Sequence, residues 1–328
     1  MSETYSGNDL TVVIPAHNCE RYIIETLQSI ESQTIRPRQV LVVENASNDG
    51  TRECIEGFAE TSDLSLRLVH TACPGVSNAR NIGFSLAETA LIAMLDADDL
   101  YQPQFLERAV DAYNRVPLLA LFFGNRKPLK EKEILDEPFL EKSRLENLTF
   151  EEPEADLRRI TGDLFSELVY GSFVSCSGAV VSRQAAYDAG LFPTALSSSE
   201  DRFFFCNLAL QGPAAYTLQT THFYRAHEAS RTGSSTWMDI RKNSLLCLHM
   251  LRLESTRKNL SSVQREALKQ ACTDSRAALF YVASEQGVRE LRRARQWARH
   301  VGVSASSGLF FWLKAAKNGL ASISQPVK

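Results

Sequence analysis

The first 125 residues alternate between short apolar runs and longer stretches whose apolar residues recur every three or four positions. Short apolar runs are typical of buried strands, and the longer stretches are typical of helices with one buried face. Ile23, Leu27 and Ile30, for example, recur at helical spacing. The expected strands are residues 10–14, 39–44, 66–70, 91–95 and 118–123. This alternation predicts an α/β fold, in which a mostly parallel sheet is flanked by helices.

The pattern changes twice after this region. Residues 127–163 are dense in charge with few apolar positions, and we expect a loop with a short helix across the edge of the sheet. Residues 173–182 return to strand-like composition, and a helix with Phe204 and Leu208 facing inward follows them. From about Met238 onward helical periodicity dominates. The pattern therefore predicts a main domain over residues 1–236 and a small C-terminal helical subdomain over residues 237–328.

Composition excludes several classes of protein. The chain has 328 residues, of which 44% are hydrophobic and 23% charged, as in an ordinary globular protein. Its 36 Lys and Arg against 39 Asp and Glu give a net charge of -3, which predicts no general affinity for nucleic acid. The seven cysteines form no CxxC pair, the N-terminus is polar, and no apolar run approaches the ~20 residues of a membrane span. We therefore expect reduced thiols and a cytoplasmic location.

Three carboxylates stand at the end of the fourth expected strand, in the sequence MLDADD. Asp96, Asp98 and Asp99 repel one another, and each loses hydration if the strand end is buried. From the residues alone, two interpretations stay open: a hard divalent cation held by oxygen ligands, or a solvated turn. His17, Glu44 and His70 also fall at carboxyl ends of strands, where ligands bind in sheets of this kind.

Six motifs, in their order and spacing, resemble the family 2 glycosyltransferases of GT-A fold. They are VVIPAHN, LVVENASNDGT, GVSNARNIG, MLDADD, SEDRFFF at 199–205 and YRAHEASRT at 224–232. The resemblance covers roughly residues 10–235. It implies that a sugar is transferred from a nucleotide-diphosphate donor, expected to be a UDP-sugar, to a glycan or lipid-linked acceptor, with inversion at the anomeric carbon.

The same resemblance assigns donor-binding roles. It implies that Pro15, Ala16 and His17 border the nucleoside, and that Glu44 contacts the base or ribose. Asp96, followed by Ala97, would bind the ribose hydroxyls. The family usually has Tyr in place of His17 and Asp-Asp in place of Glu44-Asn45. The resemblance also places a basic residue and its neighbour near the base or diphosphate; these are Arg80 and Asn78. From the residues alone, Arg80 also fits a salt bridge on a helix surface.

The resemblance further implies a metal and a general base. Asp98 would bind Mn2+ or Mg2+ against the diphosphate, where the ion neutralises charge on the departing nucleotide, and His227 would approach this metal. Asp201 would take the proton of the acceptor hydroxyl, because inversion needs a carboxylate on the face opposite the leaving group, and Glu200 would orient the acceptor. From the residues alone, Asp201 also fits a helix cap and His227 a structural role.

Two alternatives to a glycosyltransferase stay open. A nucleotidyltransferase also uses a nucleotide-binding sheet and carboxylate-bound Mg2+, but it normally carries a Gly-rich basic loop after the first strand, where this chain reads IPAHNCERY. A non-catalytic nucleotide-sugar binding module could keep Asp98 and lose the base. The intact Glu200-Asp201 pair favours an enzyme.

The C-terminal helices add a membrane hypothesis. Five arginines precede the aromatic segment GLFFWLKAAKNGLASI; they are Arg289, Arg292, Arg293, Arg295 and Arg299. Basic residues beside an apolar segment can dock on an anionic membrane surface. Packing of the segment on the catalytic domain is the alternative, and the sequence slightly favours it.

Overall fold

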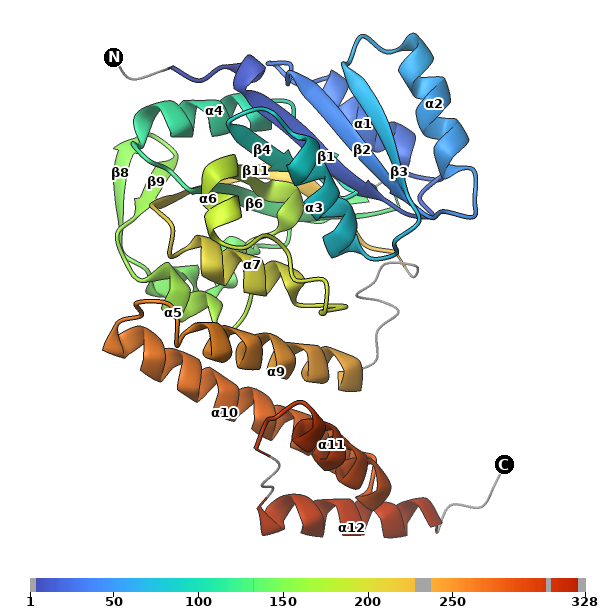
Figure 1. Cartoon of the computed structure of the whole chain (residues 1–328), viewed down its shortest axis with the longest axis vertical. Helices are drawn as coiled ribbons and strands as arrows, with labels where there is room; N and C mark the ends of the chain where they lie inside the picture. The colour runs from blue at the N-terminus through green and yellow to red at the C-terminus, as the bar shows by residue number, and fades with distance from the viewer. Residues whose placement is uncertain (1–3, 132, 228–236, 305–307, 324–328) are drawn as a thin grey trace. The chain divides into compact units, whose positions relative to one another are not determined.

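The chain of the computed structural model divides into two compact units (Figure 1). The structure describes residues 4–131, 133–227, 237–304 and 308–323. The N-terminal unit comprises Met1–Ala195 and Glu200–Glu228, and the C-terminal unit comprises Leu196–Ser199 and Ala229–Lys328.

The described strands of the N-terminal unit form one mixed sheet, in the order β3-β2-β1-β4-β10-β6-β11-β9-β8. Their bounds are β1 Leu10–Ala16, β2 Gln39–Asn45, β3 Leu66–Thr71, β4 Leu91–Met94, β6 Leu121–Lys130, β8 Phe150–Glu154, β9 Leu157–Ile160, β10 Ala179–Ser182 and β11 Ala214–Arg225. Two short strands pair with inner strands of this order: β5 (Leu100–Tyr101) pairs with β11, and β7 (Glu133–Ile134) pairs with β6.

Strand direction separates the sheet into two parts. β3, β2, β1 and β4 are all parallel, while β10 runs antiparallel to both β4 and β6. β6 and β11 are parallel again, and β9 and β8 form an antiparallel hairpin at the far edge. The expected α/β fold with a mostly parallel sheet is therefore confirmed. The parallel part comprises β1 to β4, whose carboxyl ends carry the candidate site residues.

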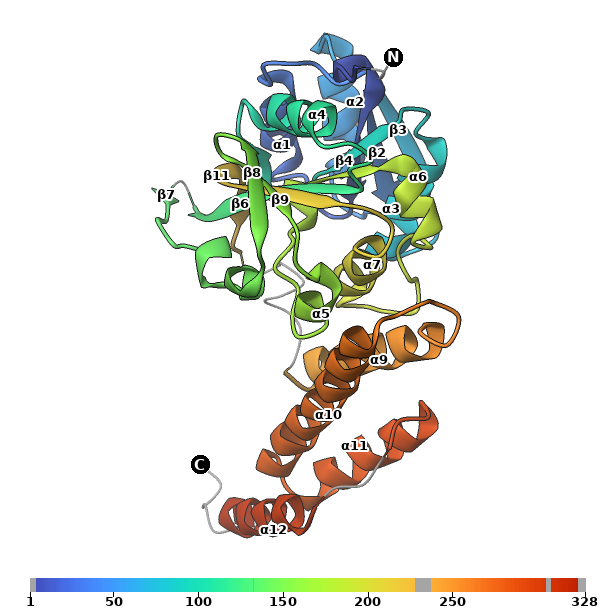
Figure 2. The same ribbon diagram turned by 90° about the vertical axis from the view of Figure 1, so that its left-hand side faces the viewer.

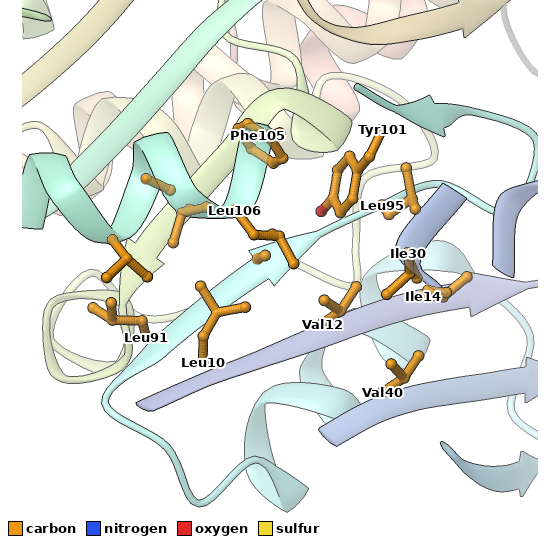
Figure 3. Close-up of a cluster of buried hydrophobic side chains, with 14 of the residues drawn as sticks. Leu10, Val12, Ile14, Ile30, Val40, Leu91, Leu95, Tyr101, Phe105 and Leu106 are labelled. Atoms are coloured by element: carbon orange, nitrogen blue, oxygen red, sulfur yellow. The ribbon is translucent and has the colours of Figure 1, made fainter. Parts of the chain in front are cut away.

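Helices cover both faces of the sheet. α1 (Ile23–Glu31), α2 (Thr51–Thr61) and α4 (Phe105–Arg115) contribute to one hydrophobic core, and α3 (Val76–Leu86) lies across the sheet from α4 (Figure 2). In that core, side chains of β1 such as Val12 pack with Ile30 and Phe105 (Figure 3). On the other face α3 approaches β1 closely, because a Cβ on Gly83 would lie 2.3 Å from Val13 Cγ1. Backbone contact of this kind fixes α3, and with it the side chain of Arg80.

The remaining helices of the N-terminal unit are short. They are η1 Gly7–Asp9, η2 Leu140–Lys142, η3 Arg144–Asn147, α5 Leu164–Leu168, η4 Cys176–Gly178, α6 Arg183–Asp188 and α7 Glu200–Leu208. As expected, Phe204 and Leu208 of α7 are buried. Phe204 stacks on Phe192 and contacts Phe84 of α3, so α7 is attached to the same face of the sheet as α3.

The expectation for residues 127–163 was wrong in part. Besides the 3-10 turns η2 and η3, this segment contains β7 and the hairpin of β8 and β9, which extends the sheet. Every residue of β8 is exposed, so the strand has no apolar alternation for the sequence to reveal.

The C-terminal unit is helical in its described residues, as expected. Its helices are α9 Trp237–Glu254, α10 Ser262–Glu285, α11 Val288–His300 and α12 Leu309–Ile323. Ser261 caps α10 through a reciprocal capping box with Gln264, and Gly287, with φ 102°, forms the turn into α11. Leu245, Leu279 and Leu291 belong to a core that these helices share. Among the residues that the structure describes, every helix is too short or too polar to span a bilayer.

Candidate functional site

The candidate donor-binding residues lie along the carboxyl ends of the parallel strands. In the register of the sheet, Ala16 of β1 pairs with Glu44 of β2, and Glu44 pairs with His70 of β3. Pro15 precedes this row, and His17 follows it with its Nδ1 2.6 Å from the backbone oxygen of Asn45. The structure therefore brings together polar groups that are far apart in the sequence, at the edge where sheets of this type bind ligands.

Glu44 is held from two sides. One carboxylate oxygen accepts a hydrogen bond from the Ser47 backbone N–H at 2.5 Å, and the other lies 2.5 Å from Nδ1 of His70. Burial alone would raise the pKa of Glu44, but the bonds from Ser47 and His70 outweigh it, and the pKa lies below its usual value. The His70 side chain is 56% exposed, whereas that of Glu44 is 3% exposed. His70 is thus the member of this pair that a ligand reaches first, and no sequence motif had singled out its partnership with Glu44.

Arg80 joins two carboxylates from distant parts of the chain. Its Nη2 donates to Asp96 Oδ1 at 2.6 Å and its Nη1 donates to Glu200 Oε1 at 3.1 Å. The residue is 1% exposed and lies on the Phe192 ring, so this is not a salt bridge on a helix surface. Asn78, two residues earlier on α3, is engaged with its own turn, because its Nδ2 donates to the Pro74 carbonyl at 2.9 Å. Arg80 therefore fixes α7 against the end of β4.

The three aspartates after β4 have three different environments. Asp96 binds Arg80, and its backbone N–H donates to Ser177 Oγ at 3.1 Å. Asp98 Oδ2 lies 2.9 Å from Nε2 of His227. Burial first, and then the charge of Asp96, raise the pKa of Asp98, while His227 opposes the shift. The carboxylates still repel one another, and the separate partner of each offsets part of that repulsion.

Asp99 is a structural residue that the sequence had not separated from its neighbours. Its carboxylate accepts hydrogen bonds from Ser177 Oγ at 2.5 Å and from the Arg225 backbone N–H at 2.9 Å. Burial, with the charges of Asp98 and Asp96, raises its pKa well above the usual value. Thr26 Oγ1 donates to the carbonyls of both Ala97 and Asp99 at 2.9 Å. The turn that carries Asp98 is thus fixed by hydrogen bonds on both sides.

His227 is positioned by an aromatic neighbour that the sequence had not indicated. The centroid of the Tyr22 ring lies 4.7 Å from that of the His227 ring. The guanidinium of Arg225 also contacts Tyr22, with its central carbon 5.0 Å from the ring centroid. Arg225 also donates its Nε to the Asp98 carbonyl at 2.9 Å. Together these contacts hold the imidazole beside Asp98. The second half of the motif that contains His227, residues 228–232, lies outside the described residues.

Glu200 and Asp201 begin α7. Glu200 is buried against Arg80, and Asp201 is partly exposed, with Oδ1 accepting from the Arg202 backbone N–H at 2.7 Å. Arg202 is itself buried and donates to the carbonyls of Leu168 and Val169 at the end of α5. The helix is therefore anchored, and of the acidic pair Asp201 is the one that can meet a second substrate.

A buried thiol and a buried imidazole lie behind this site. Burial, with the charges of Asp96 and Asp201 among others, raises the pKa of Cys176 well above its usual value, so the thiol stays neutral. Burial also lowers the pKa of His222 to about 3, and its Nε2 lies 3.0 Å from Ser175 Oγ. A Cβ on Gly178 would lie 2.3 Å from the His222 ring, so this position requires glycine.

The residues that could hold a metal are Asp98 and His227. They offer one carboxylate and one imidazole, and the Nδ1 of His227 is buried without a described hydrogen-bond partner. Within the described ranges no group of three or more His, Cys, Asp or Glu side chains is arranged as a metal site. A pair fits an ion such as Mg2+ that keeps several waters and takes substrate phosphate oxygens as its other ligands. It does not fit a closed structural metal site.

Comparison with known proteins finds a family model that matches the first part of the sheet region. Residues 11–150 match the model of glycosyl transferase family 2. A curated relative from Nostoc sp., the uncharacterized glycosyltransferase alr2836, is 30% identical over 104 residues, which are 32% of this chain and 32% of the relative. The matched stretch thus spans about a third of that relative. The family match ends before Glu200 and His227, so it carries no information about them.

Solved structures resemble the chain over nearly its whole length. S. aureus TarS in complex with UDP-GlcNAc gives a TM-score of 0.60 at 18% identity, covering 94% of this chain and 79% of that chain. The mannosyltransferase PcManGT from Pyrobaculum calidifontis, in complex with GDP-Man and Mn2+, gives 0.55 at 19% identity, covering 98% and 82%. At these identities the likeness shows the fold, which is GT-A.

Proposed function

Because residues 11–150 belong to glycosyl transferase family 2, we propose that the protein is an inverting glycosyltransferase that acts in polysaccharide or glycoconjugate synthesis. It would move a sugar from a nucleotide-diphosphate donor to a glycan or lipid-linked acceptor. The observation that carries this proposal is the pair of contacts made by Arg80. They tie Asp96, on the donor side, to Glu200, which neighbours the candidate base Asp201.

The donor would lie along the carboxyl ends of the parallel strands. Pro15, Ala16 and His17 would border the nucleoside, and Asp96, followed by Ala97, would bind the ribose hydroxyls. The proposal for Glu44 takes its environment into account: both oxygens already accept hydrogen bonds, so His70 would share the contact with the base. UDP-GlcNAc in TarS and GDP-Man in PcManGT support a nucleotide-sugar donor, and we expect a UDP-sugar.

Asp98 and His227 would hold Mn2+ or Mg2+. When bound, the ion supplies a positive charge that stabilises the departing nucleotide diphosphate. The Mn2+ in PcManGT supports this assignment. The chain's own contribution is to keep the two ligands together, because Tyr22 and Arg225 fix the imidazole and the Asp98 turn.

Asp201 would act as the general base. Its carboxylate would take the proton of an acceptor hydroxyl while the hydroxyl oxygen attacks the anomeric carbon. The bond from that carbon to the diphosphate breaks, and the leaving group keeps its electron pair. Attack from the face opposite the diphosphate inverts the configuration. Glu200, held by Arg80, would keep Asp201 in position.

A non-catalytic binding module is the second candidate, because Glu200 is engaged in an ion pair that a purely structural role also explains. Both candidates bind a nucleotide diphosphate, and only the enzyme turns it over. The first test is a thermal-shift panel of nucleotide diphosphates with and without Mn2+. A ligand at a hundred times its dissociation constant adds about 2.7 kcal/mol of stability. Stabilisation by none of them would contradict both candidates.

We also propose a cytoplasmic location with peripheral membrane contact. The structure describes all seven cysteines and joins none of them in a disulfide, which agrees with a reducing compartment. On α11 four arginines are exposed, and on α12 the side chains of Phe310 and Leu313 are each 62% exposed. Exposed arginines attract anionic headgroups, and exposed apolar side chains can enter the interface.

A further inference from the structure

Arg126 of β6 is a partly buried cation that has no carboxylate partner among the residues that the structure describes. Its guanidinium carbon lies 3.9 Å from the centroid of the Phe139 ring and 4.6 Å from that of Tyr224. No described Asp or Glu forms an ion pair with it, and no described group accepts a hydrogen bond from its guanidinium. The two rings contact the cation, but ring faces cannot replace the oxygen atoms that solvate a guanidinium in water.

Two other arginines that contact rings in this protein also have a carboxylate partner. Arg144 lies over an aromatic ring and also donates to Glu167 at 2.7 Å. Arg158 lies over two rings and has Glu152 at 3.7 Å. Arg126 has the rings alone. Its guanidinium is therefore prepared for an anion that the described protein does not supply.

The surroundings of Arg126 are fixed before any ligand arrives. Asn125, which is buried, accepts the Leu140 backbone N–H through Oδ1 at 3.2 Å and donates through Nδ2 to Glu141 at 2.9 Å. These bonds hold the segment that carries Phe139. Tyr224 comes from β11, which pairs with β6 in this stretch. The two rings are thus supplied by separate, anchored elements.

Arg126 lies near the candidate site, because its ring partner Tyr224 precedes Arg225, which contacts Asp98 and Asp99. Burial lowers the pKa of Arg126, and the neighbouring Tyr224, Asp99 and Asp201 oppose that shift. Arg126 forms no ion pair with Asp96 or Asp98, which bind Arg80 and His227 on the proposed donor side. A group bound by Arg126 is therefore assigned to the acceptor.

We propose that Arg126 binds an anionic group, a phosphate or a carboxylate, on the acceptor. The assignment to the acceptor rests on the function proposed above. A planar guanidinium presents paired N–H groups that match two oxygens of either anion, which a single ammonium cannot do. The acceptor class is then a phosphorylated or uronate-containing glycan or lipid, and a neutral sugar alone is disfavoured.

The test uses small probes in pairs. Glycerol phosphate with glycerol, and glucuronate with glucose, are titrated by ligand-observed NMR into the full chain, with and without the nucleotide diphosphate that stabilises it most. In the wild type one anion binds and its neutral counterpart does not; which anion binds distinguishes phosphate from carboxylate. Arg126→Gln should weaken that anion about 10- to 100-fold, the range for a charged hydrogen bond. Arg126→Lys should recover part of it.

Two controls keep the outcomes separate. Arg158→Gln removes an equally ring-bound arginine that has its own carboxylate, and it should leave anion binding unchanged. Nucleotide affinity should also be unchanged in Arg126→Gln. If that affinity falls by the same factor, Arg126 serves the donor diphosphate and the proposal is overturned. Equal binding of anionic and neutral probes, or no effect of Arg126→Gln, also overturns it. Failure of every nucleotide to bind contradicts the proposed function instead, while the titrations without nucleotide still report on Arg126.

Discussion

At the residue scale, the three carboxylates after β4 differ in what they contact. Asp96 has Arg80, Asp98 has His227, and Asp99 has Ser177 and a backbone N–H. In the proposed function Asp96 would serve the ribose and Asp98 the metal, whereas Asp99 holds the turn itself. The assignment of Asp98 makes a prediction for its substitution.

Asp98→Asn should weaken nucleotide-diphosphate binding only when metal is present. The substitution keeps the size of the side chain and removes the charge that would hold the ion. Calorimetric titration in Mn2+ should show a large loss of affinity, and titration in chelator should show none. Asp63→Asn is the control, because Asp63 is exposed and lies in the connection between α2 and β3, outside the candidate site. Full transferase activity of the wild type in excess chelator would contradict the metal assignment.

His222→Gln should make stability less dependent on pH. The folded-state pKa of His222 is about 3, against about 6.5 when unfolded, so the unfolded chain binds one more proton between these values. The free energy of unfolding then falls as pH falls below 6.5, by about 1.4 kcal/mol per pH unit. By pH 5 the loss from this residue is about 2 kcal/mol.

Urea unfolding at pH 7 and pH 5 measures this effect. The glutamine variant keeps a hydrogen-bonding group toward Ser175 and should lose about 2 kcal/mol less than the wild type between the two pH values. His300→Gln, an exposed position, should lose as much as the wild type. A His222→Gln variant that loses as much as the wild type would show that the imidazole is protonated in the folded protein.

The sequence proposed candidate residues but not their partners. Arg80, Asp96, Asp98 and Glu200 are candidates because the motifs that contain them resemble those of family 2 glycosyltransferases. That Arg80 bridges Asp96 and Glu200 could not be predicted, since Glu200 lies 120 positions away in the sequence. Arg126 belongs to none of the sequence motifs. It became a candidate because the structure places its guanidinium against two rings, which come from distant segments.

At the element scale, Arg80 is the link between β4 and α7. Removing it with Arg80→Met takes the guanidinium away from the buried carboxylate of Glu200, which should cost about 3–5 kcal/mol of unfolding free energy. Adding Glu200→Gln should restore part of this loss, because the uncompensated charge is gone. Chemical denaturation of the single and double variants measures both terms.

An exposed arginine with two carboxylates provides the matched control. Arg115 pairs with Asp111 at 2.7 Å and Glu154 at 2.8 Å, with its side chain 43% exposed. Arg115→Met should cost about 1 kcal/mol or less, since exposed pairs contribute little. Equal losses for Arg80→Met and Arg115→Met would mean that Arg80 does not couple the two elements.

The strands differ in how well the sequence predicts them. β1, β2 and β4 are buried on both faces, so each appears as a continuous apolar run, and the sequence located them to within a few residues. β3 lies at the edge of the sheet and is only partly buried, but its apolar residues were enough to locate it. β8 and β9 pair at the sheet edge with charged side chains in solvent, and the sequence indicated a loop there. Burial, not strand formation itself, is what apolar periodicity reports.

At the scale of the whole molecule, the proposed membrane contact depends on charge. Each exposed arginine near an anionic surface contributes about 1 kcal/mol, and this attraction is screened by salt. Replacing four arginines of α11 by glutamine should therefore reduce sedimentation of the protein with phosphatidylserine vesicles. The four positions are Arg289, Arg292, Arg293 and Arg299.

Four exposed arginines of the N-terminal unit give a control of equal charge. They are Arg36, Arg38, Arg52 and Arg67, and their replacement by glutamine should leave sedimentation nearly unchanged. Neutral phosphatidylcholine vesicles should bind neither variant, and high salt should release the wild type. Sedimentation that ignores salt, lipid charge and the α11 arginines would contradict docking through this helix.

The central claim, inverting sugar transfer with Asp201 as base, is tested most directly by NMR of the released sugar. The donor that stabilises the protein most is incubated with metal, and the first anomer formed in its hydrolysis is recorded for the wild type and for Asp201→Asn at saturating donor. From an α-linked donor the account predicts the β anomer first. It also predicts a rate about 10² to 10⁴ lower in the variant, with donor affinity unchanged. The α anomer first, or equal rates for the two proteins, would contradict the claim.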